Sequence, residues 1–105
     1  MVREYKNPTY YKWQPEDSSG EYVVIYPNGD KRWYKNGKSH REDGPAVEYA
    51  NGDKFFHKNG FFHRENGPAV EWINGHNSYY YEGECYEEIK SDEEWNNFLK
   101  LRFLW

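Results

Sequence analysis

Short alternating segments of apolar and polar residues occupy most of the chain, and they predict β-strands. Six segments have strand length and are rich in aromatic and β-branched residues: 21–26, 30–35, 46–50, 54–58, 69–73 and 78–81. Because successive side chains of a strand point to opposite faces, Val24 and Tyr26 are expected on the same face of a sheet. The pattern therefore predicts a mainly β protein.

A helical period replaces the alternation near residue 91. Ser91 followed by Glu94 has the form of a capping box, and acidic residues in a first turn favour the positive end of a helix dipole. Four large apolar side chains then fall on one helical stripe: Trp95, Phe98, Leu99 and Phe103. We expect one amphipathic helix over residues 91–104 that covers the open end or one face of the sheet. The alternative is that this stripe is a docking surface for a partner.

An internal repeat of 23 residues organises the strands. Residues 28–50 (NGDKRWYKNGKSHREDGPAVEYA) and 51–73 (NGDKFFHKNGFFHRENGPAVEWI) are identical at 15 of 23 positions without gaps. A degenerate unit at about 9–27 precedes them and a partial unit at 74–89 follows, as is typical of the ends of a repeat stack. With the helix, these units are expected to form a single domain over residues 1–105.

Glycine recurs every seven or eight residues after Gly20 and marks the turns. Asn-Gly pairs stand at 28–29, 36–37, 51–52, 59–60 and 74–75. They predict type I′ hairpin turns, because both central residues of that turn need a positive φ. Each unit is then one hairpin with a looser return through residues 38–42 or 61–65. Stacked units give an antiparallel meander of β-hairpin repeats with a C-terminal capping α-helix.

Equivalent positions of the units predict ladders of side chains. Three sets recur one repeat apart: Val24/Tyr26, Val47/Tyr49 and Val70/Trp72; Trp33, Phe56 and Tyr79; and Tyr34, His57 and Tyr80. The chain has 22 aromatic residues against 14 Ala, Val, Ile and Leu. We therefore expect rings to stack on the rings of the neighbouring unit and to form most of the core.

The unit NGDKRWYKNGKSHREDGPAVEYANG resembles the MORN repeat (membrane occupation and recognition nexus), a 23-residue β-hairpin. Residues 36–40 (Asn-Gly-Lys-Ser-His) match one turn of that family, and Asn51-Gly52 takes the second. Arg41 and Arg64 stand where the family usually has glycine. The chain is therefore most similar to the MORN-variant repeats of bacterial, phage and giant-virus proteins, rather than to the eukaryotic lipid-associated kind. The resemblance implies a hairpin stack that acts as a scaffold for interactions.

Charge and cysteine content narrow the classes of function. The net charge is −4, and residues 82–94 hold seven acids against Lys90 alone. This balance argues against binding to duplex nucleic acid, and the polybasic surface needed for anionic lipid is missing. No apolar run is long enough for a membrane span, and no secretion signal is visible. The single Cys85 cannot form an internal disulfide, which favours a reducing cytoplasm, the host's own if the protein is phage-encoded.

Few residues suggest chemistry. His40 and His63 share one repeat position, so we expect them a strand pair apart rather than around a metal ion. A structural role is expected for them and for the adjacent arginines, with a His or Arg donating to carbonyls of the Gly-Pro turns. Cys85, Ser18 and Ser19 have no evident activating base, so we expect no enzymatic activity, no metal and no cofactor.

These exclusions favour binding as the function. We expect a non-enzymatic protein-binding repeat module, because interface cores favour the aromatic and arginine side chains that this chain offers. The candidate partner-binding residues are Trp33, Tyr34, His40, Arg41, Phe56, His57, His63, Arg64, Tyr79 and Tyr80. A candidate acidic surface comprises Glu82, Glu84, Glu87, Glu88, Asp92, Glu93 and Glu94.

Three interpretations of the partner stay open. A compact chain with this repeat fits a phage accessory protein that inhibits a host defence factor by stoichiometric binding, and the acidic surface could meet a basic partner surface or mimic nucleic-acid charge, as in some small viral inhibitors. The alternative is an aromatic face that binds glycan, choline or single-stranded nucleic acid. Two copies of the chain could also form a homodimer through an open edge of the sheet.

Overall fold

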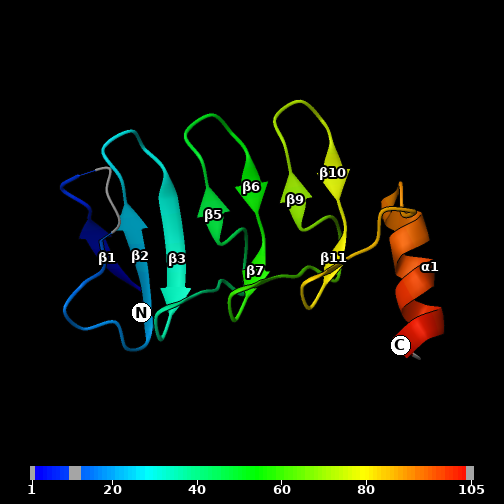
Figure 1. The fold of residues 1–105 in the computed structure, drawn as a ribbon, viewed down its shortest axis with the longest axis horizontal. Helices are drawn as coiled ribbons and strands as arrows, with labels where there is room; N and C mark the ends of the chain where they lie inside the picture. Colours follow the sequence, from blue (N-terminus) through cyan, green and yellow to red (C-terminus); the bar gives the residue numbers. More distant parts are fainter. Residues whose placement is uncertain (1, 10–12, 104–105) are drawn as a thin grey trace.

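The structure, a computed structural model, describes residues 2–9 and 13–103 of the chain. A single layer of short strands runs along the molecule, and one helix lies at its C-terminal end (Figure 1). The extents are 44 × 29 × 20 Å, so the molecule is elongated and only one sheet thick over most of its length. The expected fold class is confirmed: mainly β, built of consecutive antiparallel hairpins, with a C-terminal helix.

The described residues form strands β1 (Arg3–Lys6), β2 (Glu21–Ile25), β3 (Lys31–Lys35), β4 (Lys38–Ser39), β5 (Val47–Glu48), β6 (Lys54–Phe55), β7 (His57–Lys58), β8 (Phe61–Phe62), β9 (Val70–Glu71), β10 (Asn77–Ser78), β11 (Tyr80–Tyr81) and β12 (Glu84–Cys85), and helix α1 (Asp92–Phe103). The main sheet has the order β1-β2-β3-β5-β6-β9-β10, with β4 paired to β3. The pairs β7-β8 and β11-β12 are separate hairpins. Among the described residues, no helix is long and apolar enough to cross a bilayer.

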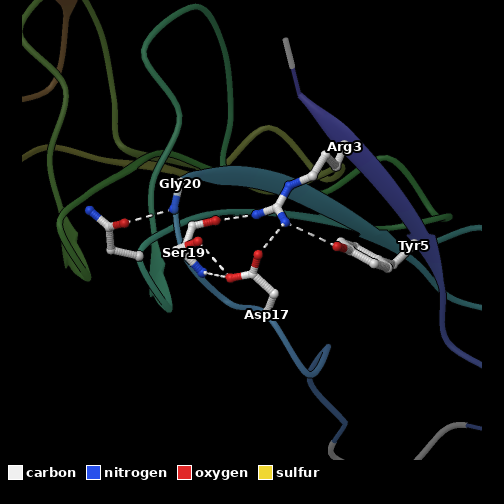
Figure 2. Close-up of polar contacts among 6 residues, drawn as sticks. Arg3, Tyr5, Asp17, Ser19 and Gly20 are labelled. Carbon is white, nitrogen blue, oxygen red and sulfur yellow. Dashed lines mark hydrogen bonds and ion pairs between the residues drawn. The ribbon is translucent and has the colours of Figure 1, made fainter.

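Strand β1 is absent from the sequence prediction, and it pairs in parallel with β2. Long-range contacts hold it there. The Arg3 guanidinium donates to the carbonyl of Ser19 and pairs with Asp17 at 3.3 Å, which ties β1 to the segment before β2 (Figure 2). The Tyr5 ring packs edge-on against Tyr22, with centroids 5.8 Å apart. Such contacts leave no periodic signal in a four-residue strand.

Each repeat combines a hairpin of the main sheet with a second, smaller hairpin. In the first repeat, β3 pairs with β5 through Lys31 and Arg32 and with β4 through Tyr34 and Lys35. In the next two units the equivalent strand is divided at Phe56 and at Tyr79, so residues 54–58 form two short strands rather than the single one expected.

The Asn-Gly pairs form two kinds of turn. At 36–37 and 59–60 each asparagine has a φ of 51° and the glycines have φ of 80° and 87°, as a type I′ turn requires. Glu82-Gly83 forms the equivalent third turn, with φ of 48° and 88°. These turns close the smaller hairpins β3-β4, β7-β8 and β11-β12.

The type I′ prediction is wrong at 28–29, 51–52 and 74–75, where only the glycine has a positive φ. Three residues connect the strands there, as shown by Tyr26, whose N–H donates to Asp30 while its carbonyl accepts from Gly29. In such a three-residue loop, the asparagine lies within a type I turn, and the glycine that follows takes the positive φ. The Asn28 side chain accepts the N–H of Asp30 at 3.0 Å, which suits asparagine to either place.

The buried residues correct the expectation of an aromatic core. Eight of the eleven buried apolar side chains in the described residues are aliphatic: Val23, Val24, Ala46, Val47, Ala69, Val70, Ile89 and Leu99. The three buried rings are Tyr22, Tyr79 and Trp95. A single layer leaves too little depth to bury most of the large rings, whereas the Ala-Val pairs of the Gly-Pro-Ala-Val segments fit beneath the loops.

Of the three ladders, the valines are buried as expected. The rings of the other two do not stack on their equivalents within the described residues. Non-equivalent rings alternate instead: Phe62 lies between His57 and Tyr80, with centroids 4.5 and 4.9 Å away.

Helix α1 packs against the third unit. Trp95 and Leu99 are fully buried in one cluster with Tyr79 and Ile89. The Trp95 Nε1–H donates to the carbonyl of Arg64 at 3.0 Å, which ties the helix to the preceding repeat. The observed bounds agree with the expected 91–104, of which residue 104 lies outside the described residues.

The cap of α1 yields the first stability prediction. The Ser91 hydroxyl accepts the N–H of Glu94 at 3.1 Å, which is the first bond of the expected capping box, and it donates to the Glu94 carboxylate at 3.4 Å. We expect Ser91→Ala to lower the free energy of unfolding by about 1 kcal/mol in urea titrations. Ser91→Asp should retain most of the stability, because a carboxylate also accepts from that N–H. An unchanged midpoint in Ser91→Ala would show that the cap does not stabilise the fold.

Candidate binding surfaces

Arg41 and Arg64 are each held between a ring and a glycine. The guanidinium carbon of Arg41 lies 3.8 Å from the Trp33 ring centroid, and that of Arg64 lies 3.9 Å from the Phe56 centroid. On the other face, a Cβ built on the glycine three residues later would come within 3.1 Å of Arg41 and 3.0 Å of Arg64. Glycine at 44 and 67 therefore leaves room for the flat guanidinium.

The N–H groups of the same two arginines form hydrogen bonds within the protein. Arg41 Nη1 donates to the carbonyl of Pro45 at 3.1 Å and to Glu48 at 3.0 Å. Arg64 Nη1 repeats these bonds with Pro68 at 3.1 Å and Glu71 at 2.6 Å. Donation to the Gly-Pro turns is thus what the structure shows. The side chains stay 22% and 24% exposed, so only an edge of each is open to a partner.

His40 and His63 each hold a turn of the next unit. The N–H of Asn59 donates to His40 Nδ1 at 3.0 Å, and the N–H of Glu82 donates to His63 Nδ1 at 2.9 Å. The Nε2 of His40 then faces Glu42 at 2.8 Å, a hydrogen bond that lowers the pKa of that carboxyl. In the described residues, no group of three or more His, Cys, Asp or Glu side chains is placed to hold a metal ion.

These side chains border a polar groove of about 460 Å³, the loop groove, lined by residues 40–44, 56–58 and 63–66. It brings together His40, Arg41, Phe56, His57, His63 and Arg64 from the candidate list. Most of their polar atoms already have partners within the protein. The loop groove is therefore mainly a joint between two repeats.

The remaining candidates lie on different faces. Strand alternation places Trp33 opposite to Tyr34, and the same holds for Tyr79 and Tyr80. Tyr79 is buried, and its hydroxyl donates to Asp92 at 2.7 Å. Burial, followed by this bond, raises the pKa of the Tyr79 phenol. Tyr34 and Tyr80 are half-buried.

His57 yields a pH prediction. Burial, followed by the nearby Arg32 guanidinium, lowers the pKa of His57 below its usual 6.5. The folded state therefore favours the neutral ring, and its contribution to stability is complete above pH 6.5 and is lost as the pH falls through the folded-state pKa. Urea titrations between pH 8 and pH 5 should show this loss. The loss of stability should be smaller in His57→Tyr, because tyrosine stands at the equivalent positions 34 and 80. Equal losses in the wild type and the variant would show that His57 is not the group responsible.

A row of rings crosses the other face of the main sheet, and three of them, Tyr26, Tyr49 and Trp72, belong to the expected ladder that contains the valines. Arg32 lies between Tyr26 and Tyr49, with ring centroids 5.8 and 5.7 Å from its guanidinium carbon. Tyr49 packs edge-on against Phe55, which in turn packs edge-on against Trp72. We call these five residues the aromatic face.

The aromatic face is open at both ends. Trp72 is 42% exposed and the adjacent Ile73 is 68% exposed. Beside Tyr49, Phe55 and Trp72 lies a hollow of about 380 Å³. At the other end, Tyr26 and Arg32 border a larger hollow of about 680 Å³.

This larger hollow, the N-terminal pocket, is walled by rings. It is lined by Trp13, Gln14, Pro15, Tyr22, Val24, Tyr26, Asp30, Arg32, Tyr34 and Gly37. Tyr22 and Tyr34 stack at 5.2 Å, and burial raises the pKa of Tyr34 to about 12, so its phenol stays protonated near neutral pH. The signal for this site was present in the sequence: Arg32 occupies the repeat position of Phe55.

The acidic surface lies on the third unit and the start of α1. All seven of its side chains are exposed. Three of them take part in local side-chain hydrogen bonds: Asp92 with Tyr79 at 2.7 Å, Glu84 with Tyr86 at 2.8 Å and Glu94 with Ser91 at 3.4 Å. Cys85 is exposed and forms no disulfide.

Comparison of the chain with protein-family models, with curated proteins and with solved structures finds no match. The functional argument therefore rests on the residues and their geometry.

Proposed function

We propose that the chain is a non-enzymatic protein-binding repeat module that uses its aromatic face. The observation that carries this proposal is the exposed Trp72-Ile73 pair at the end of a continuous row of rings and Arg32. Trp, Tyr and Arg side chains contribute most of the binding energy in protein interfaces. The resemblance to MORN repeats also supports this proposal, because it implies a scaffold for interactions.

The opposite face offers fewer free groups. Its histidines hold one repeat to the next, and its arginines bind carboxylates of their own repeat, so a partner that used them would have to displace internal hydrogen bonds. The aromatic face has no such cost, because the one hydrogen bond of the Arg32 side chain found within residues 2–9 and 13–103 is a long one, to the Tyr49 hydroxyl at 3.4 Å. The free, exposed Cys85 fits a reducing cytoplasm as the compartment. A phage protein that blocks a host defence factor is the version of this function that we favour.

Affinity capture with the full chain tests the proposal. A bacterial lysate should yield a protein retained by the wild type in a fixed ratio and lost by Trp72→Ala/Ile73→Ala, whose affinity should fall at least about thirtyfold. Leu101→Ala is the matched control, because Leu101 is 83% exposed on helix α1, away from the sheet. Loss of the captured protein in that control, or its retention by the double variant, would contradict a role for the aromatic face.

The acidic surface, the small ligands and the homodimer each predict a different result. A captured protein that is lost only when residues 82–94 are neutralised would place binding on the acidic surface. Saturable binding of choline, an oligosaccharide or a single-stranded oligonucleotide, without any captured protein, would favour the small-ligand alternative. Sedimentation of the purified chain would show whether it forms a homodimer.

A further inference from the structure

The N-terminal pocket holds an arginine that lacks an acidic partner. All 18 Asp and Glu side chains of the chain lie in the described residues, and none is within ion-pair distance of Arg32. By contrast, Arg3, Arg41 and Arg64 each pair with a carboxylate. The hydrogen bond from Arg32 to the Tyr49 hydroxyl is long, at 3.4 Å. A guanidinium has five N–H donors, so Arg32 retains most of its capacity to bind an anion.

The rings hold this guanidinium in place. Tyr26 and Tyr49 flank it, and it is half-buried beside the pocket. Arginine side chains lose less entropy on binding when stacking already fixes their plane. The repeat itself marks the position as unusual: the equivalent residue is Phe55 in the second repeat and Ser78 in the third.

The charge of the pocket selects the anion. Among the described residues, Arg32 is the one cationic residue that lines it, and Asp30 lines it as well. Lys31 and Lys35 alternate with Arg32 along β3 and so point to the opposite face of the sheet. A doubly charged phosphate would meet one positive and one negative group, whereas a singly charged carboxylate matches the free fork of one guanidinium.

The walls of the pocket favour a ligand in which the carboxylate is attached to a flat apolar group. Trp13 and Tyr34 offer flat apolar surface, and the neutral Tyr34 phenol lies among the lining groups. The volume of about 680 Å³ is within the range of sites that take small molecules or a terminal residue.

We propose that the N-terminal pocket binds a carboxylate attached to an aromatic or similarly flat apolar group. Arg32 takes the carboxylate through paired N–H bonds, and Trp13 and Tyr34 flank the flat group. The pocket adjoins the aromatic face, so this inference rests on the proposed function of that face and gives its partner a chemistry. The carboxylate has two sources, a free aromatic acid or the C-terminal residue of a partner protein.

A titration followed by NMR tests the pocket. The full chain, labelled with ¹⁵N, is titrated with 3-phenylpropionate and, separately, with 3-phenylpropionamide, while the Nε1–H signal of Trp13 and the Nε–H signal of Arg32 are recorded. We expect saturable shifts of both signals by the acid, with a dissociation constant on the order of 1 mM for so small a probe. The amide should bind about tenfold more weakly, because it cannot accept a charge-assisted pair of hydrogen bonds. Equal binding of acid and amide would overturn the proposal.

Variants locate the charge. Arg32→Gln should weaken binding of 3-phenylpropionate about tenfold, and Arg32→Lys about threefold, because lysine keeps the charge but loses the fork. Arg102→Gln is the matched control, since it removes the same charge from an exposed position of α1 and should leave binding unchanged. The spectra report directly whether each variant is folded. Equal weakening by Arg32→Gln and Arg102→Gln, or shifts centred on the loop groove, would contradict the site.

Peptide probes separate the two sources. Acetyl-Gly-Gly-Phe with a free C-terminus should bind more tightly than 3-phenylpropionate if the natural ligand is a chain end, and more weakly if it is a free acid. Failure of this inference is distinguishable from failure of the proposed function. If a protein is captured through Trp72 and Ile73 but no probe binds, the pocket proposal is wrong and the proposed function stands. If a probe binds but no protein is captured, the proposed function is wrong and the pocket proposal stands.

Discussion

Replacing Trp95 by alanine should lower the free energy of unfolding by about 3–5 kcal/mol, the largest effect that we expect from one substitution. Trp95 is fully buried, packs on Tyr79 at 5.4 Å and donates to the carbonyl of Arg64. The variant loses the buried ring and leaves that carbonyl without its donor. Urea unfolding followed by far-ultraviolet circular dichroism measures the change.

Leu101→Ala in the same helix is the control and should change the free energy of unfolding by less than about 0.5 kcal/mol, because Leu101 is 83% exposed. A loss below about 1 kcal/mol in Trp95→Ala would contradict the packing of α1 on the third unit.

Gly67→Ala should destabilise the protein by about 1 kcal/mol, although its backbone does not require glycine by its φ. The new Cβ would lie 3.0 Å from the Arg64 guanidinium, which must move away from the Phe56 ring. That movement would also strain the bonds to Pro68 and Glu71. Urea titration of the variant measures the cost.

A double-mutant cycle tests the cause. In an Arg64→Ala background the added methyl group no longer meets a guanidinium, so Gly67→Ala should then cost less than about 0.5 kcal/mol. The same cost in both backgrounds would show that the backbone, rather than the arginine, requires glycine at 67. Gly44 and Arg41 form the equivalent pair, and Gly44→Ala should behave in the same way.

The fold could be predicted to the extent that its signals are local. The 23-residue period gives the hairpins, and Ser91 with Glu94 gives the start of the helix. The turn type could not be predicted from Asn-Gly alone, because asparagine suits both a type I′ turn and the turn before a glycine bulge. Strand β1 depends on Arg3 contacts with residues 17 and 19, which no short window contains.

The binding surfaces show a different limit. Repetition drew attention to His40, Arg41 and their equivalents. The histidines join one repeat to the next, and the arginines bind the Gly-Pro turn of their own repeat. The more open residues are those where the repeats differ, as Arg32 differs from Phe55 and Tyr49 from Trp72. In a repeat protein, identical positions mainly serve the stack, and divergent positions are free to serve a ligand.

The central claim is that the aromatic face, and not the loop groove, receives a protein partner. Amide hydrogen exchange of the chain, with and without the captured partner, tests it most directly. We predict slower exchange on binding in residues 47–49, 54–55 and 70–73, with residues 40–46 and 63–68 unchanged. Protection confined to residues 40–46 and 63–68, or to residues 82–94, would contradict the claim.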